Sequence, residues 1–216
     1  MTGGPRIAVL DYGIGNLRSA EKALQHVGAA ARLVTDPAEV EAADAVVLPG
    51  VGAFGACARA LRESGLEKVA RAAIAADVPF LAVCIGFQLL YEGSDENADC
   101  ADQDETGLGV FPGRVTALAP TVKHPQMQWN QLVPVGSEAG AGSEAASLRG
   151  LGPRPWVYFV HSFAPPVGDE TVAVCDYGGP VAALVERGHL WGAQFHPEKS
   201  GRTGLALLAN FVSLAA

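Results

Sequence analysis

The chain has 216 residues, of which 49% are hydrophobic and 18% charged, so it can bury a sizeable core, and we expect one domain over residues 1–216. Its formal net charge of −8 at pH 7 argues against nucleic acid or an anionic membrane as a partner, because either would need a basic face. The four cysteines form no Cys-x-x-Cys pair and have no ligand spacing with histidine, and no apolar run reaches the length of a membrane span. We therefore expect a cytoplasmic protein with free thiols and no metal site.

The first half of the chain alternates short apolar runs with segments of helical periodicity. Strands are expected over residues 7–10, 32–34, 45–48 and 80–83, and helices over 17–27, from 36 onward, over 56–76 with a break at 64–65, and over 85–91. Such alternation implies right-handed crossovers and a parallel sheet. Ligands of parallel sheets bind beyond the carboxyl ends of the strands, where Gly13, Gly50 and Cys84 would lie.

The second half changes character and predicts antiparallel strands. Runs separated by Gly and Pro turns indicate strands over residues 108–118, 129–135, 156–163 and 171–177, and a hairpin over 181–186 and 189–195. An acidic stretch over 92–107 is expected to be an exposed loop, and a Gly/Ala/Ser/Glu-rich stretch over 136–152 a flexible insertion. An amphipathic helix over 203–214 closes the chain. The predicted class is α/β: an open, mostly parallel sheet with flanking helices and an antiparallel β extension.

Cys84 stands at the junction between the fourth expected strand and the helix that follows it. Ala82 and Gly86 lie two residues to either side, and a sharp strand-to-helix turn needs small residues there because the backbones approach closely. Such a nucleophile elbow lifts a side chain clear of the sheet, and the start of the new helix favours a thiolate. A buried structural cysteine would also fit this local sequence, so residues elsewhere must decide.

The segment Q-F-H-P-E-K-S at residues 194–200 supplies the partners that a reactive cysteine needs. A residue before proline is extended, and positions i and i+2 of an extended segment face the same way. His196 and Glu198 therefore point together, as they must if Glu198 holds one imidazole nitrogen while the other meets Cys84. Alone, H-P-E would also fit a surface turn; with Cys84 it completes a nucleophile, a base and an orienting carboxylate.

Together these motifs carry a resemblance that covers nearly the whole chain. C-I-G-F-Q at residues 84–88 and H-P-E at 196–198 resemble the class I (triad) glutamine amidotransferase family, and P-G-V-G at 49–52 resembles its oxyanion strand. D-Y-G-I-G-N-L-R-S at 11–19, W-N at 129–130, Y-F-V-H-S at 158–162 and H-P-E-K-S narrow the resemblance to the glutaminase subunits of imidazole glycerol phosphate synthases. The resemblance implies a flavodoxin-like arrangement of the sheet.

The resemblance also implies roles for individual residues. Cys84 would attack the carboxamide of L-glutamine, His196 would transfer protons, and Glu198 would orient His196. Substrate-binding positions are implied at Gly50, Val51, Gly52, Ile85, Gln88, Glu96, His161 and Ser162. A cyclase subunit with a β/α barrel would dock, as the second half of a heterodimer, on a face that includes Asn16, Arg18, Trp129 and Lys199. No cofactor is implied. Without the resemblance, Glu96 could be a solvated loop charge and His161 a packed strand histidine.

Three departures from the family pattern stand out. Ala82 occupies a position that usually holds Gly, Phe163 replaces a more usual Tyr, and Gln126 and Gln128 alter what is typically H-M-G-W-N. Three other functions fit parts of the sequence: the glutaminase of another synthase, such as pyridoxal phosphate synthase; a stand-alone cysteine hydrolase of γ-glutamyl or peptide bonds; and a non-catalytic module on the same fold. The glycines of P-G-V-G could tolerate positive φ, so a peptide between them could flip at low cost.

Overall fold

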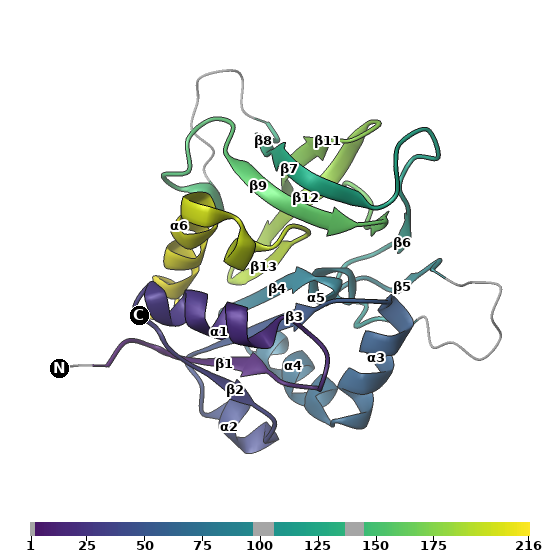
Figure 1. Ribbon diagram of the computed structural model, residues 1–216. Helices are drawn as coiled ribbons and strands as arrows, with labels where there is room; N and C mark the ends of the chain where they lie inside the picture. The colour runs from purple at the N-terminus through teal and green to yellow at the C-terminus, as the bar shows by residue number, and fades with distance from the viewer. Residues whose placement is uncertain (1–2, 97–105, 137–144) are drawn as a thin grey trace.

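Among the residues that the computed structural model describes, 3–96, 106–136 and 145–216, eight strands form one central sheet (Figure 1). Five parallel strands come in the order β2 (Ala30–Val34), β1 (Arg6–Leu10), β3 (Ala45–Gly50), β4 (Phe80–Cys84) and β13 (Leu190–Ala193). Antiparallel strands β12 (Pro180–Arg187), β11 (Thr171–Asp176) and β8 (Val133–Pro134) extend it. This flavodoxin-like order with an antiparallel extension confirms the expected fold class.

Burial explains why the central strands read as unbroken apolar runs. Every residue of β3 and of β4 is buried, because helices cover both faces of the parallel part of the sheet. The helices are α1 (Leu17–His26), α2 (Pro37–Glu41), α3 (Phe54–Glu63), α4 (Leu66–Ala75), α5 (Ile85–Gln88) and α6 (Gly201–Val212), with 3₁₀ turns η1 (Ala146–Leu148) and η2 (Pro197–Lys199). Helix α1 packs against α6, and α4 packs against α2 and α3. Right-handed crossovers place these two groups on opposite faces.

Two smaller sheets lie beside the central one. Strands β5 (Gly93–Ser94), β6 (Arg114–Ala117) and β10 (Phe163–Ala164) form the first. Strands β7 (Gln126–Gln131) and β9 (Trp156–His161) form a two-stranded antiparallel ribbon in which Gln126 pairs with His161 and Trp129 with Tyr158. The ribbon lies above α5 and the end of β4 in Figure 1, and β9 packs against η2 and α6. It therefore faces the carboxyl ends of the parallel strands.

The structure corrects the expected elements around residues 85–118. Helix α5 ends at Gln88, and residues 89–91 continue as a turn rather than as a helix. The expected exposed loop over 92–107 contains strand β5, and its Ser94 is fully buried; residues 97–105 lie outside the described part. Only Arg114–Ala117 of the expected strand over 108–118 is extended, because Leu108 and Val110 instead donate backbone hydrogen bonds to the turn after α5.

The expectation of a flexible insertion over residues 136–152 is wrong for the part that the structure describes. Residues 137–144 lie outside that part, but Ala146–Leu148 form η1, in which Ser147 and Leu148 are buried. The Glu186 carboxylate holds this turn by accepting from the backbone N–H groups of Ala146 and Ser147, both at 2.9 Å, and from the Ser147 hydroxyl at 2.5 Å. The second half of this stretch is thus packed against β12.

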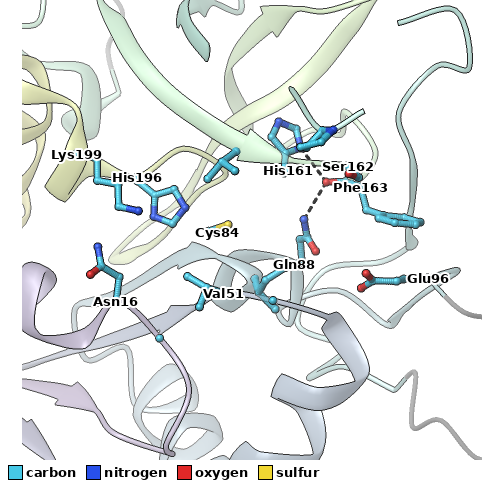
Figure 2. Close-up of a pocket in the computed structure, with 15 residues that line it drawn as sticks. Asn16, Val51, Cys84, Gln88, Glu96, His161, Ser162, Phe163, His196 and Lys199 are labelled. Carbon is cyan, nitrogen blue, oxygen red and sulfur yellow. Dashed lines mark hydrogen bonds between the residues drawn. The ribbon is translucent and has the colours of Figure 1, made fainter. Parts of the chain in front are cut away.

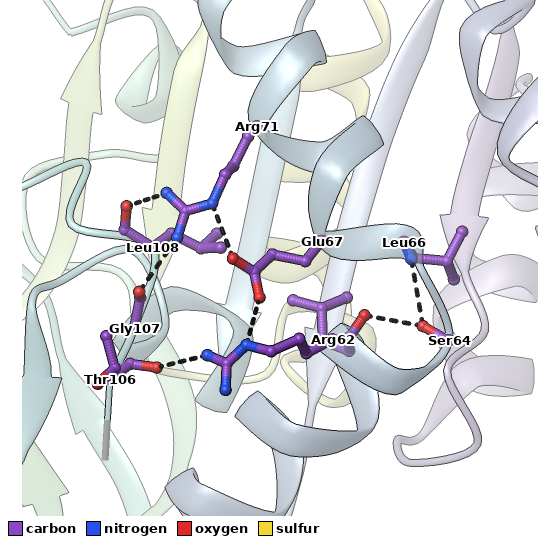
Figure 3. Close-up of polar contacts among 9 residues, drawn as sticks. Arg62, Ser64, Leu66, Glu67, Arg71, Thr106, Gly107 and Leu108 are labelled. Carbon is purple, nitrogen blue, oxygen red and sulfur yellow. Dashed lines mark hydrogen bonds and ion pairs between the residues drawn. The ribbon is translucent and has the colours of Figure 1, made fainter. Parts of the chain in front are cut away.

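A cluster of charged side chains joins α3 and α4 to the segment at residues 106–108 (Figure 3). The Glu67 carboxylate lies 3.0 Å from Arg62 Nε and 2.8 Å from Arg71 Nε, and Arg71 also donates to the carbonyl of Leu108. Burial raises the pKa of Glu67, but the two guanidinium groups more than offset it and lower the pKa overall.

In the described part of the chain, no helix is long and apolar enough to cross a membrane.

Candidate active site

The backbone at Cys84 has the strained geometry of a nucleophile elbow. Cys84 ends β4 with φ +55° and ψ −111°, and α5 begins at the next residue. Positive φ is uncommon for a residue with a side chain, so the surrounding packing must hold it there. Gly86 shows how tight that packing is, because a Cβ at this position would lie 2.0 Å from the carbonyl oxygen of Leu48 on β3. The Cys84 side chain is nearly buried, with 3% of the residue exposed.

His196 and Glu198 face each other as the H-P-E motif predicts. His196 precedes Pro197 in an extended conformation, and its Nδ1 lies 2.9 Å from Glu198 Oε1. Both side chains are buried. Asn16 at the start of α1 donates from Nδ2 to the same carboxylate oxygen at 3.1 Å. Because this oxygen receives two donors, the carboxylate is fixed in place and can fix the imidazole in turn.

The electrostatics of this group favour a charged imidazole. Burial lowers the pKa of His196, but the Cys84 sulfur and the Glu198 carboxylate outweigh burial and raise the pKa to about 9. Burial raises the pKa of Glu198, and the hydrogen bond from His196 more than offsets that effect, so the pKa of Glu198 is lowered overall. Figure 2 shows the His196 ring directed at Cys84, and Nε2 is buried without a hydrogen-bond partner among the described residues.

A pocket of about 560 Å³ opens in front of Cys84 (Figure 2). Cys84 and His196 lie toward one end of it and Glu96 toward the other. The structure brings seven of the eight expected substrate-binding residues to its wall: Val51, Gly52, Ile85, Gln88, Glu96, His161 and Ser162. Glu96 Oε2 accepts from the backbone N–H of Phe54 at 2.7 Å, which holds the carboxylate at the start of α3. Glu96 is therefore part of the pocket wall rather than a solvated loop charge.

Gly50 is the exception, and the structure shows a packing reason for this glycine. Gly52 has φ +91°, but Gly50 does not fall in the positive-φ region. Gly50 is required instead by close packing, because a Cβ there would lie 2.7 Å from the backbone nitrogen of Gly86 and 2.9 Å from the hydroxyl oxygen of Tyr12. A larger side chain at Gly50 would therefore displace the start of α5.

The four residues expected at a partner interface have different surroundings. Lys199 and Asn16 line the pocket, and Asn16 is also bonded to Glu198. Arg18 is exposed on α1, where it forms an ion pair with Glu21 at 3.0 Å. Trp129 is 48% exposed and packs edge-on against Tyr158 across the ribbon. Asn16 and Lys199 thus border the pocket, whereas Arg18 and Trp129 are exposed and do not line it.

Two buried residues of the site were missed by the sequence analysis. Gln194 donates from Nε2 to Cys84 Sγ at 3.9 Å and accepts from Gln88 Nε2 at 3.1 Å. Ser200 donates to the carbonyl of His196 at 2.6 Å and accepts from the backbone N–H of Tyr158 at 3.0 Å, which ties the triad loop to β9. Both residues lie within Q-F-H-P-E-K-S, so their place in that motif was the available signal.

The described residues contain no group of three histidine, cysteine or acidic side chains that could hold a metal ion. The site presents a thiol, an imidazole, carboxylates and backbone amides. A thiolate can attack a carbonyl carbon, and an imidazole held by a carboxylate can protonate a leaving group and activate water.

Comparison with known proteins agrees with this chemistry. A family model described as glutamine amidotransferase class-I matches residues 8–214. The imidazole glycerol phosphate synthase subunit HisH of Thermosynechococcus vestitus is 45% identical over 215 residues, which cover 97% of each chain. The protein of the same name from Deinococcus radiodurans is 44% identical over 211 residues, which cover 96% of this chain and 93% of the relative.

A solved structure described as a glutamine amidotransferase has a TM-score of 0.72 with 22% identity, covering 97% of this chain and 98% of its own. At that identity the likeness supports the fold alone. The family match over nearly the full length is decisive: the chain belongs to the class-I glutamine amidotransferase family.

Proposed function

We propose that this chain is the glutaminase subunit of an imidazole glycerol phosphate synthase, in which it hydrolyses L-glutamine and supplies ammonia for histidine biosynthesis. The observation that carries the proposal is the strained Cys84 facing the buried His196–Glu198 pair at the wall of a pocket of about 560 Å³. The relatives named above are subunits of that synthase, and their similarity extends over nearly the whole length of both chains.

In the proposed reaction the Cys84 thiolate attacks the side-chain carboxamide carbon of glutamine. The tetrahedral intermediate collapses to a γ-glutamyl thioester as the C–N bond breaks, and the His196 imidazolium gives its proton to the departing nitrogen, which leaves as ammonia. Neutral His196 then takes a proton from water, the resulting hydroxide attacks the thioester, and glutamate leaves as the Cys84 thiolate re-forms. Glu198 orients the imidazole through Nδ1, with Asn16 fixing the carboxylate.

Backbone N–H groups near Val51 and Ile85 are proposed to stabilise the oxyanion. Ile85 begins α5 directly after Cys84, and Val51 directly follows β3, whose last residue Gly50 pairs with Cys84. Losing one such donor typically costs about 2.7–4 kcal/mol of transition-state stabilisation. The close packing of Gly50 and Gly86 is what brings these two pieces of backbone together.

The far end of the pocket is proposed to bind the amino-acid part of glutamine. The negative charge of the Glu96 carboxylate is complementary to the positive charge of the α-ammonium group of glutamine. Gln88 Oε1 is buried and has no hydrogen-bond partner among the described residues, so it can accept from an N–H of the substrate. His161 and Ser162 complete the wall opposite Val51.

The cyclase partner is proposed to dock on the face that carries Asn16, Arg18, Trp129 and Lys199, forming a heterodimer. Trp129 and Met127 are exposed large hydrophobic residues of β7, 48% and 64% exposed respectively, and large apolar side chains of this kind are typical of protein interfaces. Lys199 and Asn16 border the pocket from which ammonia must leave. A partner on this face would receive ammonia directly.

The proposal is tested by glutaminase assays of the purified chain with and without its cognate cyclase subunit and the cyclase substrate. We expect weak activity alone and strong stimulation in the complex. A chain that hydrolyses γ-glutamyl amides at the same rate with and without the cyclase would instead be a stand-alone hydrolase. A chain that is inactive in both conditions, although folded and bound to the cyclase, would contradict the proposed role of Cys84.

A further inference from the structure

A line of buried polar groups runs from β11 to the pocket and is not used by the proposed mechanism. Gln126, at the start of β7, is fully buried, and its side-chain amide lies between Cys175 of β11 and His161 of β9. His161 Nδ1 lies 2.9 Å from the carbonyl oxygen of Phe163, and Gln88 Nε2 lies 2.8 Å from the same oxygen. Figure 2 shows both contacts converging on Phe163.

Hydrogen-bond chemistry fixes the state of His161. A carbonyl oxygen can only accept, so Nδ1 must carry the proton that is donated to Phe163. Burial lowers the pKa of His161 to about 4; the hydrogen bond to Phe163 acts in the opposite direction, and the nearby His196 lowers the pKa further, so the ring is neutral near pH 7. In a neutral imidazole with a protonated Nδ1, Nε2 is an acceptor.

The acceptor at Nε2 in turn fixes the direction of the Gln126 amide. The amide oxygen is placed 2.9 Å from His161 Nε2, but two acceptors cannot bond to each other, and the oxygen and nitrogen of an amide are exchanged by rotating the group. With the amide nitrogen facing His161, the amide oxygen faces the Cys175 sulfur, from which the two amide atoms lie 3.7 and 4.0 Å away. Burial raises the pKa of Cys175 to about 11, so the thiol keeps its proton and can donate it.

All the donors in this line then point toward the pocket: Cys175 to Gln126, Gln126 to His161, and His161 to Phe163. The Phe163 carbonyl oxygen accepts hydrogen bonds from His161 Nδ1 and from Gln88 Nε2. Gln88 Nε2 donates its second hydrogen to Gln194 Oε1. With both hydrogens committed, the Gln88 amide cannot rotate, and Oε1 is left as the free acceptor. An orientation that is set in this way is available before the substrate arrives.

We propose that Gln126 is a positioning residue for substrate binding: through His161 and the Phe163 carbonyl it fixes the Gln88 carboxamide so that Oε1 accepts from bound glutamine. The inference rests on the proposed function for the identity of the substrate. The orientation of His161 and Gln88 follows from the contacts alone. Gln126 stands at a departure from the family pattern, so this is a property of the present chain.

The test replaces Gln126 by Leu, which is similar in volume but cannot donate, and Gln128 by Leu as the control. Gln128 lies two residues along β7 and is exposed. We expect Gln126→Leu to raise KM for glutamine about 5- to 50-fold, the range for loss of a buried hydrogen bond, while kcat changes less than about 2-fold. Gln128→Leu should leave both constants unchanged. Equal KM values for Gln126→Leu and the wild type would overturn the proposal.

A second measurement does not depend on turnover. Nitrogen-15 NMR of the wild-type chain at pH 7 should show His161 protonated at Nδ1 and not at Nε2, and Gln126→Leu should shift the side-chain amide signals of Gln88. Protonation at Nε2, or unchanged Gln88 signals, would overturn the positioning role even if glutamine is the substrate. The expected signals in a chain that does not hydrolyse glutamine would instead locate the failure in the proposed function. If Gln126→Leu does not fold, Gln126→His, which keeps a ring N–H, should retain a KM near the wild-type value, and a large rise would contradict the proposal.

Discussion

The two walls of the pocket are built in different ways. One wall, the backbone wall, consists of the ends of β3 and β4 and the loop after β13. Close backbone packing fixes its side chains and amide groups: Cys84 has positive φ, and there is no room for a Cβ at Gly50 or Gly86. The other wall, the hydrogen-bonded wall, consists of the end of β9 and residues 161–163, with Gln126 of β7 behind it, and hydrogen bonds among Gln126, His161, Phe163 and Gln88 fix its groups.

The difference predicts a division of labour. On the proposed mechanism the backbone wall presents the nucleophile, the base and the oxyanion donors, so its variants should act mainly on kcat. The hydrogen-bonded wall presents acceptors to the non-reacting part of the substrate, so its variants should act mainly on KM.

The largest effect is expected for Cys84→Ala. It removes the nucleophile and should lower the glutaminase kcat by more than about 10⁴-fold, as losses of nucleophiles generally do. Since little volume is lost, the melting temperature and the affinity for glutamine should stay close to those of the wild type. A purified, folded Cys84→Ala variant that still hydrolysed glutamine would show that Cys84 is not the nucleophile.

His196→Ala should come next and should exceed Glu198→Gln. Deleting the base removes proton transfer, whereas Glu198→Gln leaves the imidazole present but poorly oriented and less basic. We expect His196→Ala to lower kcat by about 10³-fold or more. The loss of kcat in Glu198→Gln should be smaller by at least about tenfold. The reverse order of kcat values, measured in the same complex, would contradict the two roles.

A smaller but still large effect is expected for Gly50→Ala. The new Cβ would meet the Gly86 nitrogen at 2.7 Å and displace the start of α5, so kcat should fall by about 10²–10³-fold, as for loss of one oxyanion donor. Gly52→Ala is the matched control, because a Cβ there meets nothing within 4 Å and only the φ of +91° costs energy. Equal kcat values for the two variants would show that close packing at Gly50 is not what matters.

The charge of His196 provides a test by pH. Its pKa is about 9 in the folded state against 6.5 when unperturbed, so its contribution to folding stability is fully present below pH 6.5 and is lost as the pH rises to about 9. Glu198→Gln should lower the pKa of His196, because it removes one of the negative partners. NMR titration of the ring in both forms measures this directly. An unchanged pKa in Glu198→Gln would show that the carboxylate does not hold the imidazolium.

The smallest effect is expected away from both walls, at η1. Ser147→Ala removes the hydroxyl that donates to Glu186 and should cost about 1–2 kcal/mol of unfolding free energy with kcat and KM unchanged. Ser213→Ala is the control, since its hydroxyl bonds to an exposed carbonyl within α6 and should cost under about 0.5 kcal/mol. Equal midpoints of denaturation in urea would show that η1 does not contribute to stability.

The same contrast explains how far the sequence could predict the molecule. Strands buried on both faces read as apolar runs, and the elbow and the H-P-E turn are local in sequence, so the placement of Cys84, His196 and Glu198 in the backbone wall could be predicted. The close packing of Gly50 was not predicted, because its neighbour Gly86 lies on α5, far from β3 in the sequence. The stretch over 136–152 was predicted to be flexible because its composition is polar. The Glu186 carboxylate that holds its second half is on β12, far away in the sequence.

The hydrogen-bonded wall could be predicted only in part. His161 and Gln88 were expected at the pocket from the resemblance, but nothing local in the sequence indicates that Gln126 and Cys175 stand behind them. The contacts of Gln126 with His161 and Cys175 depend on the register of β7 with β9 and on the position of β11, which are set by the tertiary structure. Gln194 and Ser200 were passed over within a motif whose other members had evident chemistry.

The central claim is that Cys84 attacks the carboxamide of glutamine, and covalent trapping tests it most directly. A chloroketone analogue of glutamine places an alkylating carbon where the carboxamide would be, and peptide mass spectrometry then locates the adduct. The account predicts a single adduct on Cys84 that excess glutamine prevents from forming. An adduct on Cys57 or Cys175 in place of Cys84, or labelling of Cys84 that glutamine does not slow, would contradict it.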